Sequence, residues 1–168
     1  GIKTEWNPVD EKVGAIRIRT LGTYHDSLNG MQRGRNSVWM VEVDGLNIVH
    51  LGDLGHELSE EQAKTIGKGA VLMVPVGGIY TINGDQARKV VRQLKPRLYV
   101  LPMHYGVPGY DDLQGPEEFL EGQKASTKKM TDTNEPAPVT DRGRFVSRYT
   151  ALVLAAPLAS LALRAFRA

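Results

Sequence analysis

The feature that most constrains the fold is an apolar run at residues 70–76, followed by an amphipathic segment and a β-rich run at residues 97–101. The first run is short and bounded by glycines, which favours a strand buried on both faces, and Pro75 indicates either the end of the strand or an edge position. Residues 83–94 carry apolar side chains at helical spacing, namely Ala87, Val90, Val91 and Leu94. Strand, helix and strand in this order predict a βαβ unit with two parallel strands, and therefore the α/β class.

Three further β-rich runs precede this unit, at residues 13–21, 37–43 and 46–51. Asp44-Gly45 separates the last two and predicts a tight hairpin, so these strands should be antiparallel. If the first run also pairs antiparallel to the middle one, it runs in the same direction as the third. A short helix is expected after Ser59, which with Gln62 has capping-box spacing, and it should end at Gly67.

The pattern weakens towards the end of the chain. We expect one domain over residues 1–123, a linker or loop over 124–148, and an apolar C-terminal strand, helix or tail over 149–168. Residues 149–163 are uncharged and mostly apolar, but a membrane span needs roughly 20 such residues, so none is expected. The favoured interpretation is a last strand over 150–154 followed by an apolar helix or tail.

Composition excludes several function classes. The 168 residues include no cysteine, which rules out a disulfide scaffold, a thiolate metal site and a cysteine nucleophile. The net charge is only +2 and the basic residues are scattered, so no nucleic-acid partner is expected. The chain opens on Gly1 rather than methionine, and we expect the natural N-terminus to lie upstream. A cytoplasmic location is compatible with these features.

Three potential metal ligands follow predicted strands, and they should meet at one edge of the sheet. They are His25, Asp53 and His104, and imidazole nitrogen and carboxylate oxygen are donors that zinc accepts. Two simpler interpretations stay open at this point. A loop histidine is commonly a polar surface residue, and an aspartate between Gly52 and Gly55 is commonly part of a turn. Similarly, the Arg33-Gly34-Arg35 segment is either an anion contact or a solvated loop.

Several short motifs together resemble the metallo-β-lactamase superfamily, in particular its ascorbate-6-phosphate lactonase-like branch. The resemblance covers roughly residues 10–122, and its order and spacing are more specific than any one segment. The motifs are Gly22-Thr23-Tyr24-His25-Asp26, Arg33-Gly34-Arg35-Asn36, His50-Leu51-Gly52-Asp53-Leu54-Gly55-His56, Val74-Pro75-Val76-Gly77-Gly78-Ile79-Tyr80-Thr81, Leu94-Lys95-Pro96 and Pro102-Met103-His104-Tyr105.

The resemblance implies an αββα sandwich and a hydrolase with one or two zinc ions, or manganese or iron in their place. It implies His25 and His104 as metal ligands and Asp53 as the catalytic carboxylate that bridges two ions. A metal-bound hydroxide would then attack an ester, lactone or phosphodiester-type bond of a small-molecule substrate, anionic substrates included. His56, Tyr80 and Arg35 are implied near the substrate or around the ligands.

The chain departs from the family pattern in one respect: the signature H-x-H-x-D-H loop does not occur in it. We therefore expect a partial αββα sandwich that lacks the N-terminal strands and the first metal motif. Two hypotheses follow. Either the chain is an incomplete part of a metal-dependent hydrolase, or it is a non-catalytic fragment or interaction half-domain without a competent metal site. Missing strands would leave apolar sheet surface exposed, and such a surface could associate with a second copy of the chain to form a homo-oligomer.

Overall fold

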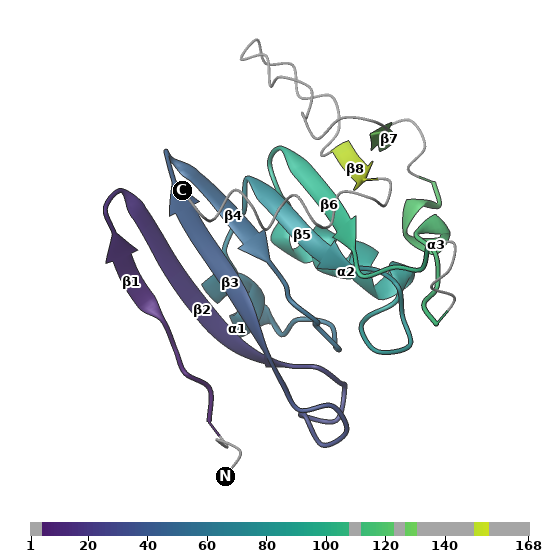
Figure 1. Cartoon of the computed structure of the whole chain (residues 1–168), viewed down its shortest axis with the longest axis horizontal. Coiled ribbons are helices and arrows are strands. Elements are labelled where there is room, and N and C mark those ends of the chain that lie inside the picture. The colour runs from purple at the N-terminus through teal and green to yellow at the C-terminus, as the bar shows by residue number, and fades with distance from the viewer. Residues whose placement is uncertain (1–4, 108–111, 123–126, 131–149, 155–168) are drawn as a thin grey trace.

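The computed structural model describes residues 5–107, 112–122, 127–130 and 150–154. Its centre is one twisted eight-stranded sheet with the order β1-β2-β3-β4-β5-β6-β8-β7 (Figure 1). The α/β class predicted from the sequence is confirmed. The strands are β1 (Asp10–Val13), β2 (Ile16–Tyr24), β3 (Arg35–Val43), β4 (Leu46–His50), β5 (Val71–Pro75), β6 (Tyr99–Met103), β7 (Thr127–Met130) and β8 (Thr150–Leu154).

Strand directions place the carboxyl ends of four strands at one edge of the sheet. β2 and β4 are both antiparallel to β3, so they run the same way. β5 is parallel to β4, and β6 is parallel to β5, as the βαβ unit predicts. The ends of β2, β4, β5 and β6 therefore lie at the same edge, and the loops that follow them can meet.

The hairpins follow from local backbone conformation. Asp44 and Gly45 both have positive φ, 49° and 74°, which is the conformation of a two-residue turn between antiparallel strands. The strand expected over residues 13–21 is present from Ile16 onwards as part of β2, but the expectation that it begins at Val13 was wrong. Gly14 takes φ 61° and breaks that run into a hairpin between β1 and β2, because glycine adopts this conformation without steric cost.

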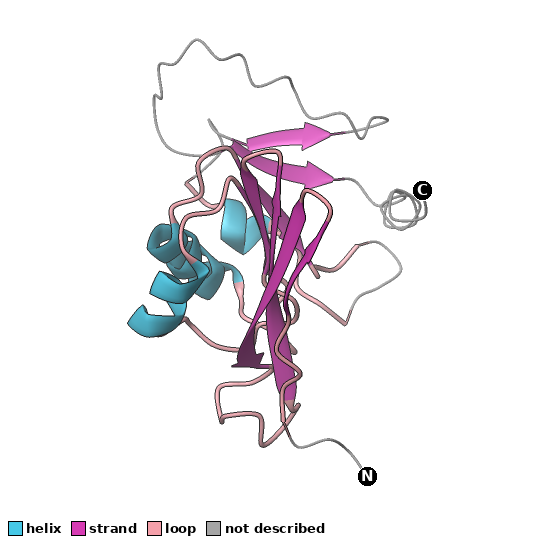
Figure 2. Ribbon diagram, turned by 90° about the vertical axis from the view of Figure 1, so that its left-hand side faces the viewer, coloured by secondary structure: helices cyan, strands magenta, loops and turns pink. Residues whose placement is uncertain are grey.

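The three helices of the described residues lie on the same face of the sheet (Figure 2). They are α1 (Glu60–Ile66), α2 (Gly84–Leu94) and α3 (Glu117–Leu120). The capping boxes Ser59–Gln62 and Asn83–Gln86 satisfy free N–H groups at the start of α1 and α2. The core lies between these helices and the sheet, and its fully buried side chains include Val38, Met40, Val49, Leu72, Val74, Val90 and Phe119.

Helix α2 buries the face that its spacing predicts, and the buried residues are Ala87, Val90, Val91 and Leu94. The same spacing predicts that Arg88, Lys89 and Arg92 face solvent. Arg92 is exposed, and the Lys89 side chain is 53% exposed, as expected. The expectation that Arg88 also points to solvent was wrong. Its side chain is only 19% exposed, and its guanidinium donates to the Glu118 carbonyl and pairs with Asp85. Arg88 thereby fastens α3 to α2.

The opposite face of the sheet is apolar and only partly covered among the described residues. Alternate residues of the strands point there, and Trp39 is 42% exposed. β5 was expected to be buried on both faces. This was wrong for one of them, because Val71 and Met73 stay partly exposed while Leu72 and Val74 are buried. The partly exposed residues of this face include Ile18, Trp39, Val41, Ile48 and Met73.

The C-terminal part is described only in two short strands. β8 matches the strand predicted over residues 150–154. β7 lies within 124–148, where a linker or loop was expected, and it pairs in parallel with β8. The rest of that range, and the predicted helix or tail after residue 154, lie outside the described residues. In the described part of the chain, no helix has the length and apolar character needed to cross a membrane.

Candidate metal centre

The predicted ligands follow three of the four strands that end at the common edge. His25 comes directly after β2, Asp53 follows β4, and His104 comes directly after β6. The turn after β5 lies between the last two, because β5 is the neighbour of both β4 and β6. The sequence argument for a common edge is therefore supported by the strand pairing.

His104 and Asp53 come close together across this edge. The Nε2 atom of His104 lies 3.9 Å from Oδ1 of Asp53, and their side chains are 29% and 52% exposed. The chain turns sharply at His104, which has a φ of 51°. Gly77 makes room for that turn, since a Cβ on it would come 2.1 Å from the His104 carbonyl oxygen. Because the side chains of His104 and Asp53 are both partly exposed, solvent and a ligand can reach them.

His25 is held by backbone contacts on both sides. Its N–H donates to the Gly34 carbonyl at 3.1 Å, which closes the loop between β2 and β3. On the other side, Gly55 donates its N–H to the Tyr24 carbonyl at 3.0 Å. These bonds hold the Asp53–Gly55 turn against the end of β2.

Two ring nitrogens in this region are buried without a hydrogen-bond partner among the described residues, Nε2 of His25 and Nδ1 of His104. Leaving a buried polar atom unsatisfied is costly, and a bound metal ion is one way to satisfy an imidazole nitrogen. The donor types fit zinc, manganese or iron. However, no three His, Asp or Glu side chains in the described part of the chain form a group that could hold a metal ion. The structure brings His104 and Asp53 together and does not complete a three-ligand group with His25.

Asn36 positions the backbone before Asp53. Its amide nitrogen donates to the Thr23 hydroxyl and to the Leu51 carbonyl, both at 2.8 Å. Its amide oxygen accepts the N–H of Asp53 at 2.9 Å. One side chain on β3 thus ties the end of β2 to the turn that carries Asp53, a role that the sequence did not reveal.

Asp26 organises the loop after His25. Its buried carboxylate accepts backbone N–H groups from Leu28, Gly30, Gln32 and Arg33 at 2.7–3.1 Å. Burial alone would raise the pKa of Asp26, but these four donors prevail and lower it to about 2. The carboxylate is ionised and fully engaged in the loop, so it is a structural group rather than a free metal ligand.

His50 lies near Asp53 and was given no role by the sequence. Its Nδ1 accepts the Gly52 N–H at 3.0 Å, so a neutral ring carries its hydrogen on Nε2. Burial lowers the pKa of His50, and the nearby Asp53 opposes the shift. The position of His50 opposite Trp39 and Met73 on neighbouring strands is set by sheet register.

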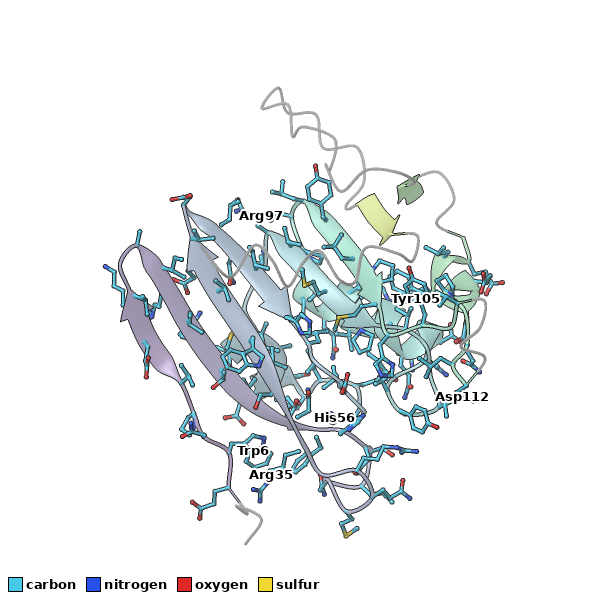
Figure 3. All side chains as sticks on the ribbon, in the orientation of Figure 1. Trp6, Arg35, His56, Arg97, Tyr105 and Asp112 are labelled. Atoms are coloured by element: carbon cyan, nitrogen blue, oxygen red, sulfur yellow. The ribbon has the colours of Figure 1, made fainter. Side chains whose placement is uncertain are left out.

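Both ring nitrogens of His56 form hydrogen bonds within the chain. Its Nε2 accepts the Tyr24 N–H at 3.2 Å, and a neutral ring then donates from Nδ1 to the Glu57 carbonyl at 2.7 Å. Figure 3 shows His56 near the loops at the edge of the sheet, with Arg35 beside Trp6 towards the N-terminal strand. The guanidinium of Arg35 lies 4.7 Å from the Trp6 ring centroid. Tyr80 lies in the turn after β5, is 44% exposed and contacts Arg33.

A sequence profile of the β-lactamase superfamily domain matches residues 4–104, more than half of the chain. The chain belongs to the metallo-β-lactamase superfamily. The matched segment of this superfamily member includes all three predicted ligands, His25, Asp53 and His104.

Two curated relatives agree with this placement. A UPF0173 metal-dependent hydrolase of Pyrococcus furiosus is 37% identical over 120 residues, which are 68% of this chain and 52% of the relative. A UPF0173 metal-dependent hydrolase of Thermoplasma acidophilum is 31% identical over 106 residues, 62% of this chain and 46% of the relative. This superfamily member therefore spans about half the length of the curated relatives that it matches.

Solved structures show the same fold. A candidate zinc-dependent hydrolase of the metallo-β-lactamase superfamily from Thermotoga maritima superposes with a TM-score of 0.69 at 27% identity, over 88% of this chain and 69% of that one. Igni18, a metallo hydrolase of Ignicoccus hospitalis, gives a TM-score of 0.52 at 25% identity, over 71% of this chain and 51% of that one. These relatives and both solved structures carry the names of metal-dependent hydrolases.

Proposed function

We propose that this chain carries part of the active site of a metal-dependent hydrolase, with zinc as the favoured ion. The observation that carries the proposal is the approach of His104 Nε2 to Asp53 Oδ1 at 3.9 Å. Two buried histidine nitrogens that lack partners among the described residues, Nε2 of His25 and Nδ1 of His104, support it. Residues far apart in the sequence meet there, and the relatives are named metal-dependent hydrolases. The finer placement in the ascorbate-6-phosphate lactonase-like branch is part of the proposal.

His25, Asp53 and His104 are the residues that would hold one or two ions. Asp53 is the more exposed member of the pair that it forms with His104, so its carboxylate can reach an ion shared with other ligands. Asn36 and Gly77 position this pair by holding the backbone of Asp53 and of His104. His56 keeps the turn after Asp53 against β2, and it acts through that contact.

A bound divalent ion supplies a water of lowered pKa and polarises a carbonyl or phosphoryl group. The protein residues do the rest. The Asp53 carboxylate would help to hold the ion and would accept a hydrogen bond from a water at the site, and the exposed side of the His104–Asp53 pair would admit a small-molecule substrate with an ester, lactone or phosphodiester bond. Tyr80, on the neighbouring turn, provides an aromatic surface for it.

The alternative of a non-catalytic fragment rests on a separate observation. Catalytic zinc takes three protein ligands and a water, whereas the described residues form no group of three that could hold an ion. We therefore expect the 168-residue chain alone to bind zinc weakly and to hydrolyse little. A longer protein that includes an upstream H-x-H-x-D-H segment is expected to bind zinc tightly and to hydrolyse its substrate.

Calorimetric titration with zinc, manganese and iron tests the proposal. Asp53→Asn and His104→Gln should each weaken zinc binding by about tenfold or more, because each removes a ligand from a small set. Asp44→Asn is the matched control, since Asp44 lies in the turn between β3 and β4, away from the common edge. Assays with ester, lactone and phosphodiester substrates follow on the longer protein. Zinc affinity unchanged in both variants would contradict the assignment of these ligands, and inactivity of the longer protein would favour the non-catalytic alternative.

A further inference from the structure

Two loops at the common edge contact each other through an arginine and a tyrosine. The guanidinium carbon of Arg33, in the loop after β2, lies 5.5 Å from the ring centroid of Tyr80, in the turn after β5. Both residues are exposed. Because these loops adjoin His25 and His104, the contact links the two sides of the proposed metal centre.

The backbone on each side of this contact is held by hydrogen bonds. Arg33 donates its N–H to the Asp26 carboxylate at 2.7 Å, and the next residue, Gly34, accepts the His25 N–H. The turn with Tyr80 is closed by Gly78 N–H donating to the Ile82 carbonyl, and Ile82 N–H donates to the Leu54 carbonyl at 2.9 Å. Arg33 is therefore positioned relative to His25, and Tyr80 relative to the turn that carries Asp53.

The turn after β5 also contains a strained residue. Ile79 has a φ of 55° and is 55% exposed, although a β-branched residue is rarely found in the left-handed region. Strain of this kind persists where surrounding contacts enforce it, and it is concentrated at binding sites. Ile79 and Tyr80 together present an apolar and aromatic surface at the tip of the turn.

Arg33 has no acidic partner in residues 5–107 and 112–122, whereas Arg17, Arg19 and Arg88 are each paired with a carboxylate. A guanidinium that stacks on an aromatic ring keeps the N–H groups of its planar edge free for a bidentate oxyanion. We propose that Arg33, supported by Tyr80, binds an anionic group of the substrate, a carboxylate or a phosphate, outside the metal ligands. This inference rests on the proposed function, because that function places the hydrolysed bond at the neighbouring metal centre. It names the substrate class: compounds that carry a hydrolysable bond and, apart from it, a negatively charged group.

The test is a nuclear magnetic resonance titration of the metal-free chain, which requires no turnover. The probes are phenyl phosphate, benzoate and benzyl alcohol, which share an aromatic ring and differ in charge. At least one of the two anions should shift the Arg33 Nε–H signal until it saturates. Benzyl alcohol should bind at least about tenfold more weakly than that anion. Phosphate and carboxylate substrates are distinguished by which anion binds better.

Arg33→Gln should reduce the affinity for the anion to that for benzyl alcohol. Arg33→Lys keeps the charge and much of the length of the side chain, so it guards against a folding defect and should lose only part of the affinity, because lysine cannot bind bidentately. Arg92→Gln, on the exposed side of α2, is the matched control and should bind like the parent.

Equal binding of phenyl phosphate by the parent and by folded Arg33→Gln and Arg33→Lys would overturn the inference, as would equal binding of benzyl alcohol and the anions. The outcome is separate from that of the proposed function. Anion binding that depends on Arg33, in a protein without hydrolase activity, would refute the proposed function alone. Hydrolysis by the longer protein with no dependence on Arg33 would refute this inference alone.

Discussion

Gly55 lies directly against the backbone of His25, where a Cβ would come 2.2 Å from the His25 carbonyl carbon. The contact brings the turn after β4 onto the end of β2, and thus brings the carriers of two predicted ligands together. A glycine is required here by the close approach of two backbones rather than by an unusual φ.

Gly55→Ala should therefore cost more stability than an alanine placed in open space. Gly67→Ala is the comparison, because Gly67 has a φ of 72° and a ψ of −169° and a Cβ added to it would meet nothing within 4 Å, so only the conformational cost of a backbone region favoured by glycine applies, about 1–3 kcal/mol. Thermal unfolding of both variants measures the difference, and zinc titration should show a loss only for Gly55→Ala. Equal destabilisation of the two variants would show that separating the backbones of Gly55 and His25 costs no more than the backbone strain at Gly67.

Asn36→Asp should destabilise the fold by about 1–3 kcal/mol and weaken metal binding, because it removes both N–H donors of the amide. The new oxygen would face the Leu51 carbonyl, which now accepts a hydrogen bond at 2.8 Å. Denaturant unfolding measures the loss of stability. The exposed Asn7→Asp variant is the control and should change stability by no more than about 0.5 kcal/mol. Normal stability and zinc affinity in Asn36→Asp would show that this side chain does not position Asp53.

Asp26→Asn should lower the melting temperature by several degrees. The amide has one acceptor oxygen in place of two, so it cannot accept all four backbone N–H groups of the loop over residues 28–33. Differential scanning calorimetry measures the effect, with the exposed Asp112→Asn as the control. If the hydrogen bonds of Asp26 do not stabilise the fold, the two variants will have the same melting temperature.

Leu94→Ala should destabilise the protein by about 2–5 kcal/mol, because this side chain is 2% exposed and lies in the core between α2 and the sheet. Arg92→Ala, on the exposed side of the same helix, should stay within about 0.5 kcal/mol of the parent. Denaturant titration compares the two. A small effect at Leu94 would mean that α2 packs less tightly than its burial indicates.

Local chemistry determined much of this fold. The capping boxes, the Asp44-Gly45 turn and the helical spacing of Ala87, Val90, Val91 and Leu94 are interactions between near neighbours in the chain, so they can be recognised in the sequence. The order of the strands was enough to predict that residues after β2, β4 and β6 would lie at one edge. The split of the first strand at Gly14 was missed, because an alternating pattern continues through the turn.

Only the tertiary structure decided which side chains at that edge come within reach of one another. The 3.9 Å approach of His104 to Asp53 depends on how β4, β5 and β6 pair, and the contact of Arg33 with Tyr80 depends on two loops fixed by separate hydrogen bonds. The sequence shows which residues follow each strand but not their rotamers or their partners. Distances of a few ångströms result from register, loop length and close packing acting together, and these are properties of the whole fold.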